Sequence, residues 1–259
     1  MAANPTPVLQ LRQISKRFGA VQALSNVDFE VYPAEVVALV GDNGAGKSTL
    51  VKTIAGAYRP DSGQYIFEGR EVTIHTPREA TNLGVETVYQ DLALCDNLDV
   101  VANLYLGREG VRVTGPHPLH LLSEVEMERK ATDVLRELSV KIPNVRSQIA
   151  TLSGGQRQSV AVARSVMWNS KVVLLDEPTA ALGVEQTFQV KELIKRLRSR
   201  GLGVVVISHN LADVFEVANR VVVMRLGRRV ATFDTSQSTA QEVVGAITGA
   251  TLPAAVAAG

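Results

Sequence analysis

Hydrophobic and polar residues alternate in the first part of the chain. Val27, Phe29 and Val31 are separated by single polar residues, and this period of two predicts a strand with one buried face. Residues 65–70 have the composition of a second strand that runs into a turn. Together the two segments predict a small antiparallel sheet near the N-terminus.

Further along the chain, the alternation gives way to continuous apolar runs. Residues 36–40 are all apolar and precede a glycine, which is typical of a strand buried on both faces of a parallel sheet. The remaining core strands are expected at 85–90, 171–175, 203–207 and 221–224. Helical spacing or capping residues predict helices at 47–57, 77–84, 185–199 and 211–218. Strands that alternate with helices predict an α/β fold with a mostly parallel sheet.

The segment 91–165 contains no buried strand run. Apolar residues at helical spacing predict a helix that includes Val125, Ala131, Val134, Leu135 and Leu138. We therefore expect a mostly helical lobe inserted into the α/β core, with 111–122 unassigned. The chain is predicted to form one domain, with a core at 1–90 and 166–230, a helical lobe at 91–165 and a C-terminal extension at 231–259. The last residues, 252–259, are expected to be frayed.

Composition narrows the class of protein. The 259 residues are 46% hydrophobic, and 27 Lys plus Arg against 26 Asp plus Glu leave a net charge of +1. This balance provides no broad attraction to nucleic acid or anionic lipid. The single cysteine, Cys95, allows no internal disulfide and is expected to be structural or incidental. Because no apolar run approaches ~20 residues and no secretory signal is visible, we expect a cytoplasmic protein that reaches a membrane only through a partner.

Residues 41–48 match the P-loop pattern of glycine, four residues and Gly-Lys-Ser. Glycines let backbone N–H groups approach phosphates, and the following helix directs its positive end at them. Lys47 would reach the β- and γ-phosphates of ATP, and the Ser48 hydroxyl would ligate Mg²⁺. A plain glycine turn is the alternative, but it gives no reason for a lysine at the helix start. The predicted ATP-binding residues are Gly41, Asp42, Asn43, Gly44, Ala45, Gly46, Lys47, Ser48 and Thr49.

Two carboxylates, Asp176 and Glu177, end the apolar run at 172–175. The carboxyl ends of buried strands are where ligands bind in open α/β sheets. Asp176 would hold Mg²⁺, and Glu177 would polarise the attacking water as a general base. An acidic pair that only complements a helix dipole is the alternative, and Pro178 weakens it.

A glycine-rich pentapeptide lies between these two motifs in the chain, and its Ser153 is also a good helix cap. The three motifs together resemble the ATPase subunits of ABC transporters, over roughly residues 8–230. The resemblance implies ATP and Mg²⁺ as ligands. It also implies a dimer, because in that family the pentapeptide closes over ATP held by a second subunit. We call these five residues the signature: Leu152, Ser153, Gly154, Gly155 and Gln156.

Single residues gain a role only through this resemblance. Gln90 corresponds to a glutamine that senses Mg²⁺ or the attacking water and connects to the membrane partner; a solvated strand-end glutamine is the alternative. His209 resembles the histidine that contacts the γ-phosphate. Phe18 would stack on adenine, unless it packs in the core. Where the family commonly has an aspartate that helps to join the two ATP sites, this chain has Gly183.

The amino-acid sequences of three segments resemble those of the ATPases of ribose-, xylose- and fructose-type sugar importers, which often contain two fused halves. The segments are residues 41–49, 177–185 and 208–210. This chain has one half with a complete catalytic set. The resemblance therefore implies a homodimer under two integral membrane permease subunits, at the cytoplasmic face of the inner membrane, with a sugar-binding protein outside. The alternatives are a transporter for another substrate and a non-transport ATPase that acts on nucleic acid or ribosomes.

The absence of a heptad run, of a cysteine cluster and of a second ATPase unit from the sequence argues against the non-transport alternative. We therefore expect no nucleic-acid partner. His117 and His120 form a His-x-x-His pair, but no third ligand is evident. A solvated loop is favoured over a metal site at this pair.

Overall fold

The N-terminal part of the chain forms an antiparallel sheet in a computed structural model that describes residues 6–109, 111–114 and 119–250. The strand order is β2-β1-β4-β5. The strands are β1 (Leu9–Phe18), β2 (Val21–Val31), β4 (Ser62–Phe67) and β5 (Arg70–Val72). The predicted antiparallel sheet is confirmed. The sequence analysis did not predict β1. The pairing of β1 with β2 shifts register between Leu11 and Ile14, and this irregularity interrupts the alternation of buried and exposed residues along β1.

A six-stranded sheet forms the centre of the molecule, in the order β12-β11-β3-β10-β9-β6. Its strands are β3 (Val36–Val40), β6 (Val85–Val88), β9 (Val172–Asp176), β10 (Gly203–Ile207), β11 (Arg220–Arg225) and β12 (Arg228–Asp234). All neighbours are parallel except β11 and β12. The edge strand β12 carries the sheet past residue 230, where the predicted core ended.

The apolar runs of this sheet are buried on both faces, as the sequence predicts. Ala38 and Val40 pack in one hydrophobic cluster with most of the helices, whereas Val37 and Leu39 pack in a second cluster with the N-terminal sheet and the helix that follows the P-loop. The same division by alternate residues holds for β9, β10 and β11. Each central strand therefore contributes to two cores at once.

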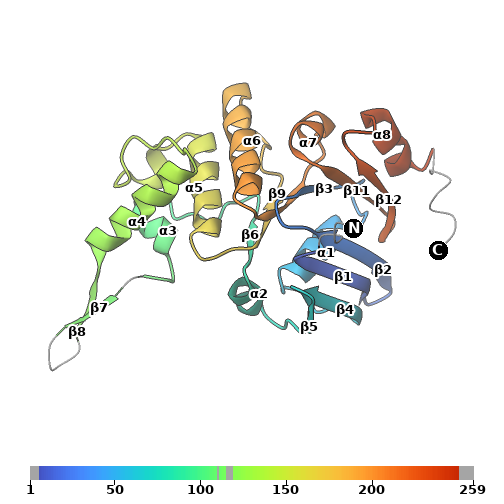
Figure 1. Cartoon of the computed structure of the whole chain (residues 1–259), viewed down its shortest axis with the longest axis horizontal. Helices are drawn as coiled ribbons and strands as arrows, with labels where there is room; N and C mark the ends of the chain where they lie inside the picture. Colours follow the sequence, from blue (N-terminus) through green and yellow to red (C-terminus); the bar gives the residue numbers. More distant parts are fainter. Residues whose placement is uncertain (1–5, 110, 115–118, 251–259) are drawn as a thin grey trace, which may run out of the picture.

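Helices cover the sheet, and Figure 1 shows most of them gathered away from the N-terminal sheet. They are α1 (Lys47–Ile54), α2 (Pro77–Leu83), α3 (Val100–Tyr105), α4 (Glu124–Glu137), α5 (Gly154–Val166), α6 (Val184–Ser199), α7 (Leu211–Val217) and α8 (Ala240–Thr248), with a 3₁₀ turn at Ile149–Thr151. The helices predicted from the sequence are confirmed. In α4, Ala131 and Leu135 are buried, but Val125 in its first turn is exposed.

The lobe between β6 and β9 is not wholly helical. The unassigned segment 111–122 contains an antiparallel hairpin of β7 (Val111–Thr114) and β8 (Leu119–Leu122), which projects from the lobe in Figure 1. His120 belongs to β8, while His117 and the tail 252–259 lie outside the described residues.

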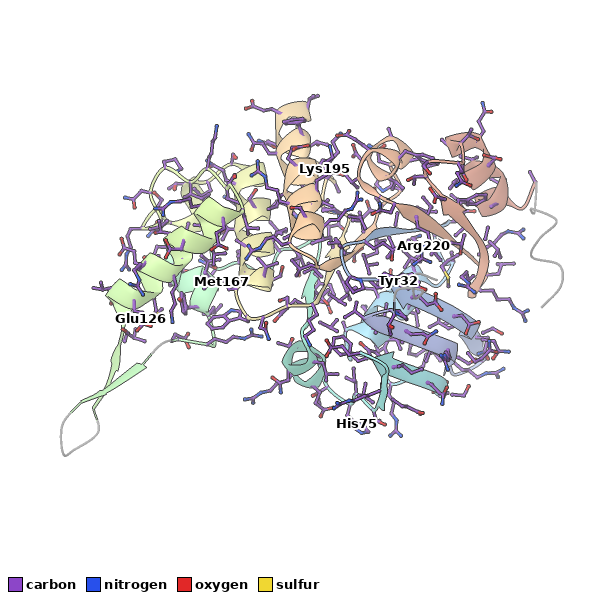
Figure 2. All side chains as sticks on the ribbon, in the orientation of Figure 1. Tyr32, His75, Glu126, Met167, Lys195 and Arg220 are labelled. Carbon is purple, nitrogen blue, oxygen red and sulfur yellow. The ribbon has the colours of Figure 1, made fainter. Side chains whose placement is uncertain are left out.

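Arg220 at the start of β11 ties the central sheet to the N-terminal sheet. Its guanidinium donates hydrogen bonds to the Glu35 carboxylate (2.8 Å) and to the backbone carbonyl of Glu30 (2.9 Å). It also lies 5.7 Å from the centre of the Tyr32 ring (Figure 2). Because Arg220 and Glu35 are both mostly buried, this bidentate pair holds the two sheets in a fixed relation.

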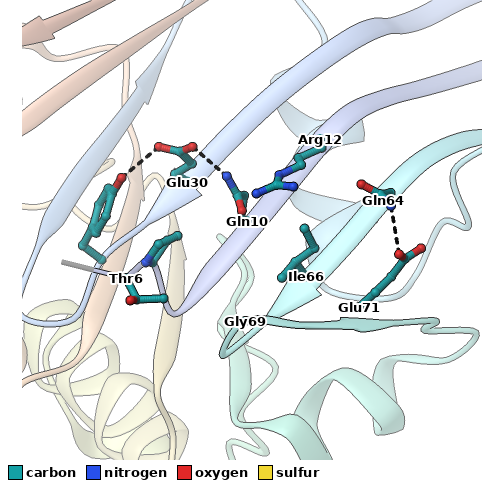
Figure 3. A pocket seen from close by; sticks show the side chains of 10 residues that line it. Thr6, Gln10, Arg12, Glu30, Gln64, Ile66, Gly69 and Glu71 are labelled. Atoms are coloured by element: carbon teal, nitrogen blue, oxygen red, sulfur yellow. Dashed lines mark hydrogen bonds between the residues drawn. The ribbon is translucent and has the colours of Figure 1, made fainter. Parts of the chain in front are cut away.

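The outer face of the N-terminal sheet carries a hollow of about 440 Å³. Figure 3 shows its polar rim, in which the Gln10 amide and the Tyr32 hydroxyl donate to the Glu30 carboxylate, and Gln64 donates to Glu71. The hollow includes no residue of the three sequence motifs. The nucleotide site that the sequence predicts therefore does not lie in this hollow.

None of the helices in the described part of the chain has the length and hydrophobicity needed to cross a bilayer. Within the same residues, no group of three or more His, Cys, Asp and Glu side chains is arranged to hold a metal ion.

Candidate nucleotide-binding site

The register of the central sheet brings the predicted site residues to one edge. Leu39 of β3 lies beside Ile207 of β10, Ile207 lies beside Asp176 of β9, and Leu175 of β9 lies beside Val88 of β6. Because these strands are parallel, the segments that follow them all leave from the carboxyl edge. These segments are the P-loop, the residues after Asp176, the residues after Ile207 and the turn with Gln90.

The P-loop, residues 41–48, needs glycine at two positions for steric reasons. A Cβ on Gly41 would clash with the carbonyl oxygen of Met224, and one on Gly46 would come within 2.8 Å of the carbonyl oxygen of Ala23. Both glycines also have positive φ angles, 149° and 101°. Since the Gly46 cap has no side chain, no side-chain acceptor occupies the N–H groups of the first turn of α1. These groups can bind phosphate.

Lys47 lies across the P-loop. Its Nζ donates to the backbone carbonyls of Gly41 (2.6 Å) and Asp42 (3.0 Å). Partial burial lowers the pKa of the Lys47 ammonium, and the negative charges of Glu177, Asp42 and Asp176 oppose that effect. The Lys47 ammonium thus contacts the P-loop directly and interacts electrostatically with Asp176 and Glu177.

Asp176 ends β9 half-buried. Burial raises the pKa of its carboxyl, the neighbouring Glu177 raises it further, and Lys47 and Lys52 act in the opposite direction. Among the described residues, no hydrogen bond or ion pair occupies this carboxylate. An unpaired carboxylate beside a P-loop is suited to a divalent cation.

Glu177 follows Asp176 in a left-handed backbone conformation with φ of 50°, which is uncommon for a residue other than glycine. Its N–H is held by the carbonyl oxygen of Ile207 at 2.9 Å. Such backbone strain recurs at functional sites, where the surrounding structure imposes it. Here it occurs at the point where the chain leaves the sheet after β9.

His209 contacts Glu177 directly. The imidazole Nδ1 lies 3.0 Å from the Glu177 Oε2, and the His209 side chain remains 78% exposed. Two predicted catalytic residues that lie 32 positions apart in sequence are thus joined in space. The exposed remainder of the imidazole is free to contact a ligand at this edge.

Gln90 does not end a strand, as the sequence had suggested. β6 ends at Val88, and Gln90 lies exposed in the turn that follows, because the strand loses its pairing with β9 beyond Leu175. The turn that contains Gln90 still leaves the carboxyl edge of the sheet next to β9, the strand that ends at Asp176. The structure thus places Gln90 on a loop rather than on the sheet.

Phe18 at the end of β1 is not a core residue. Its ring is 42% exposed and meets the edge of Tyr58 at a centroid distance of 5.1 Å. Lys16 Nζ lies 5.5 Å from the Phe18 ring centre. The sequence analysis missed Tyr58, whose only signal was an aromatic residue shortly after the P-loop helix. The exposed ring of Phe18 remains available to stack on a base.

The signature begins α5, on the helical side of the molecule in Figure 1. Ser153 caps the helix: its Oγ accepts from the N–H of Gln156 (3.3 Å), and the Gln156 Oε1 accepts from the N–H of Ser153 (3.0 Å). The predicted helix cap at Ser153 is confirmed, and the two hydrogen bonds together form a capping box. Ser153 and Gly154 are exposed, while Gly155 is buried against α6.

Gly155 is predicted to tolerate no side chain. A Cβ at this position would lie 2.9 Å from the Cβ of Gln186, so α5 and α6 would have to separate. We expect Gly155→Ala to destabilise the protein by about 1–3 kcal/mol, as overpacking does. The midpoint of thermal unfolding, compared between Gly155→Ala and the wild type, measures this loss. A Gly155→Ala protein as stable as wild type would contradict the close packing of α5 on α6.

The residues at the carboxyl edge fit Mg²⁺ chemically. Ser48 is exposed in the first turn of α1, directly after Lys47, and no hydrogen bond within the described residues engages its hydroxyl. Hydroxyl and carboxylate oxygens are the ligands that Mg²⁺ prefers together with phosphate oxygens. Ser48 and Asp176 can therefore share such an ion with a bound triphosphate.

A glycine loop between a buried strand and a helix, with a lysine inside it and two carboxylates on a nearby strand of the same sheet, defines a P-loop nucleotide-binding protein. The model of one family, described as ABC transporter, matches residues 24–180. The chain belongs to the ABC transporter family, as one of its ATPase cassettes.

Three curated relatives show how far this similarity extends. The fructose import ATP-binding protein FrcA of Rhizobium meliloti is 47% identical over 95% of this chain and 96% of its own length. The xylose/arabinose import ATP-binding protein XylG of Sulfolobus acidocaldarius is 46% identical over 85% and 86%. The ribose import ATP-binding protein RbsA 1 of Rubrobacter xylanophilus is 42% identical over 86% of this chain but only 44% of its own length.

Solved structures share the fold. The ADP conformation of MJ1267, an ATP-binding cassette of an ABC transporter, has a TM-score of 0.78 and 26% identity. The match covers 94% of this chain and 95% of that one. The α/β cassette with an antiparallel N-terminal sheet, a mostly parallel core sheet and a helical lobe is confirmed.

Proposed function

We propose that this chain is the ATPase subunit of a sugar import complex, in which ATP hydrolysis at a dimer interface drives uptake through membrane permease subunits. Relatives named for fructose and for xylose/arabinose import, similar over most of their length, support the sugar substrate. The proposal of a dimer rests on one observation about the positions of the P-loop and the signature. The P-loop lies at the carboxyl edge, while the exposed end of the signature, Ser153 and Gly154, faces outward from the helical lobe.

In the proposed dimer, each ATP lies between the P-loop of one subunit and the signature of the other. Lys47 binds the β- and γ-phosphates, and Phe18 stacks on the adenine. Ser48, Asp176 and Gln90 would hold Mg²⁺, which supplies charge neutralisation on the phosphate oxygens. The signature presents backbone N–H groups at the start of a capped helix to the γ-phosphate.

Glu177 acts as the general base. Its carboxylate orients the attacking water and accepts its proton, while His209 Nδ1 holds Oε2 of the same carboxylate at 3.0 Å. The exposed imidazole then contacts the γ-phosphate, so that one residue bridges the base and the phosphoryl group. Loss of the γ-phosphate removes the link between the subunits, and the dimer opens.

Opening reaches the permease through the segment after Gln90. Arg164 of α5 donates to the backbone carbonyls of Leu92 (3.1 Å) and Ala93 (2.8 Å). Because the signature begins the same helix, a shift of α5 on ATP binding would move this segment directly. The proposal places the chain at the cytoplasmic face of the inner membrane, with a sugar-binding protein on the outer side.

Co-purification tests the transport assignment. The tagged chain is expressed in its own host, the membranes are solubilised gently, and the associated proteins are identified. Recovery of a multi-span permease with a sugar-binding protein is the expected result. Recovery of nucleic acid or ribosomes without a permease would contradict a role in transport. Recovery of a permease for another class of substrate would support transport but contradict sugar as the substrate.

Gly183 offers a test of how the two ATP sites are joined. Nothing lies within 4 Å of a Cβ built at this position, and Gly183 is the cap of α6. We expect Gly183→Asp to stabilise the fold by a few tenths of a kcal/mol as a better cap. We also expect a larger Hill coefficient for ATP hydrolysis, because the family resemblance implies that an aspartate in this segment helps to join the two ATP sites. An unchanged Hill coefficient in the more stable variant would show that Gly183 does not limit coupling.

A further inference from the structure

Asp213 closes a ring of contacts around the Glu177–His209 pair. Its Oδ2 accepts a hydrogen bond from the Thr179 hydroxyl (3.0 Å) and another from the Asn210 side-chain amide (3.0 Å). Thr179 is two residues after Glu177, and Asn210 directly follows His209. The two segments that carry the pair are therefore joined twice, once through Glu177 and His209 and once through Asp213.

The environment of Asp213 makes this second link rigid. The residue is 9% exposed in α7, and its Oδ1 lies 3.2 Å from the Nζ of Lys191 in α6. Lys191 also pairs with Glu216, one turn further along α7. A buried carboxylate with an ion pair on one oxygen and two donors on the other has little freedom to move.

Asn210 anchors the other end of the link. Its Oδ1 accepts from the N–H groups of Ala212 (3.1 Å) and Asp213 (3.4 Å), so it caps α7. Its own N–H is held by the Ser208 hydroxyl at 3.1 Å. Both polar atoms of the side chain that follows His209 are therefore engaged, and the amide nitrogen binds Asp213 directly.

We infer that Asp213 is a positioning residue for ATP hydrolysis, which fixes Glu177 and His209 relative to each other through Thr179 and Asn210. The inference rests on the proposed roles of Glu177 and His209. Asp213 touches neither side chain of the pair, so it acts on the placement of the base and not on ATP. Loss of the link therefore lowers kcat and leaves ATP affinity unchanged.

Turnover measurements on the full chain separate these effects. Asp213→Ala is expected to lower kcat by about 10- to 100-fold, the scale of a small misplacement of a catalytic group, with KM and ATP Kd within about twofold of wild type. Glu216→Ala is the matched control, because it removes another carboxylate partner of Lys191 from the same helix. Equal kcat losses in the two variants, or a kcat for Asp213→Ala within twofold of wild type, would overturn the inference.

Thr179 gives a second route that leaves the buried carboxylate in place. Thr179→Val removes the hydroxyl donor at nearly constant volume and is expected to lower kcat in the same way, whereas Thr179→Ser keeps the donor and should recover most of the rate. The double variant with Asp213→Ala should be no slower than the slower single variant, since both break one link. Additive losses would overturn the inference.

A readout without turnover completes the test. The ring ¹³C signal of His209 in histidine-labelled protein, assigned by its loss in His209→Gln, should shift in Asp213→Ala and Thr179→Val but not in Glu216→Ala. An unmoved signal in the first two variants would overturn the inference. Turnover by Glu177→Gln at the wild-type rate would instead show that the proposed base is wrong.

Discussion

Glu177→Gln is expected to reduce ATP turnover by about 10²–10⁴-fold, the contribution of a positioned general base. Glutamine has the same shape as glutamate but cannot accept a proton from water at neutral pH. The P-loop contacts of Lys47 and the glycine backbone are untouched, so ATP should bind with an affinity within a few-fold of wild type. Steady-state turnover and equilibrium binding of ATP measure the two quantities.

The same variant should accumulate as a closed dimer. If the γ-phosphate links the P-loop of one subunit to the signature of the other, ATP that binds but does not react will hold the dimer shut. Light scattering in ATP and Mg²⁺ would then show twice the monomer mass. Glu185→Gln, an exposed carboxylate at the start of α6, is the control that should keep normal turnover. Wild-type hydrolysis by Glu177→Gln would exclude Glu177 as the base.

Lys47→Ala is expected to weaken ATP binding by one to two orders of magnitude. The ammonium lies across the loop, where it donates to backbone carbonyls at 2.6 Å and 3.0 Å, and in the proposed site it would bind the β- and γ-phosphates of ATP. Charge-assisted hydrogen bonds of this kind contribute about 1.5–3 kcal/mol, and each 1.4 kcal/mol is tenfold in affinity. Calorimetric titration with ATP measures the loss.

A control for Lys47 must remove a lysine without touching the loop. Lys171→Ala does so, because Lys171 pairs with the exposed carboxylate of Glu68 at 2.6 Å. It should bind ATP as the wild type does. If Lys47→Ala bound ATP equally well, the P-loop assignment would be wrong, since no other described residue places an ammonium across this loop.

The central sheet could be predicted from the sequence because each of its buried strands is indicated by a few consecutive residues. Residues 36–40 are apolar at every position, so a strand formed by them is shielded from water only if both faces of the sheet are covered. β12 was not predicted, because this edge strand buries only Ala231 and therefore has no continuous apolar run. The β7–β8 hairpin lies in a segment whose pattern favours neither period.

The site was predictable where a motif fixes the backbone and not where it depends on tertiary contacts. The P-loop pattern predicts Gly41 and Gly46, which the structure explains by close approach to Met224 and Ala23. The contact of His209 with Glu177 and that of Tyr58 with Phe18 could be seen only in the folded structure. Nothing in the pattern around Asp213 distinguishes it from an ordinary polar residue in an amphipathic helix.

The division of each central strand between two hydrophobic clusters has a consequence for unfolding. Val37 and Ala38 are neighbours in the chain, yet they belong to opposite clusters. Neither the N-terminal sheet nor the helical lobe can lose its packing without exposing the shared strands to water. The two clusters should therefore melt together, and a mutation in either one should lower the midpoint of a single cooperative transition.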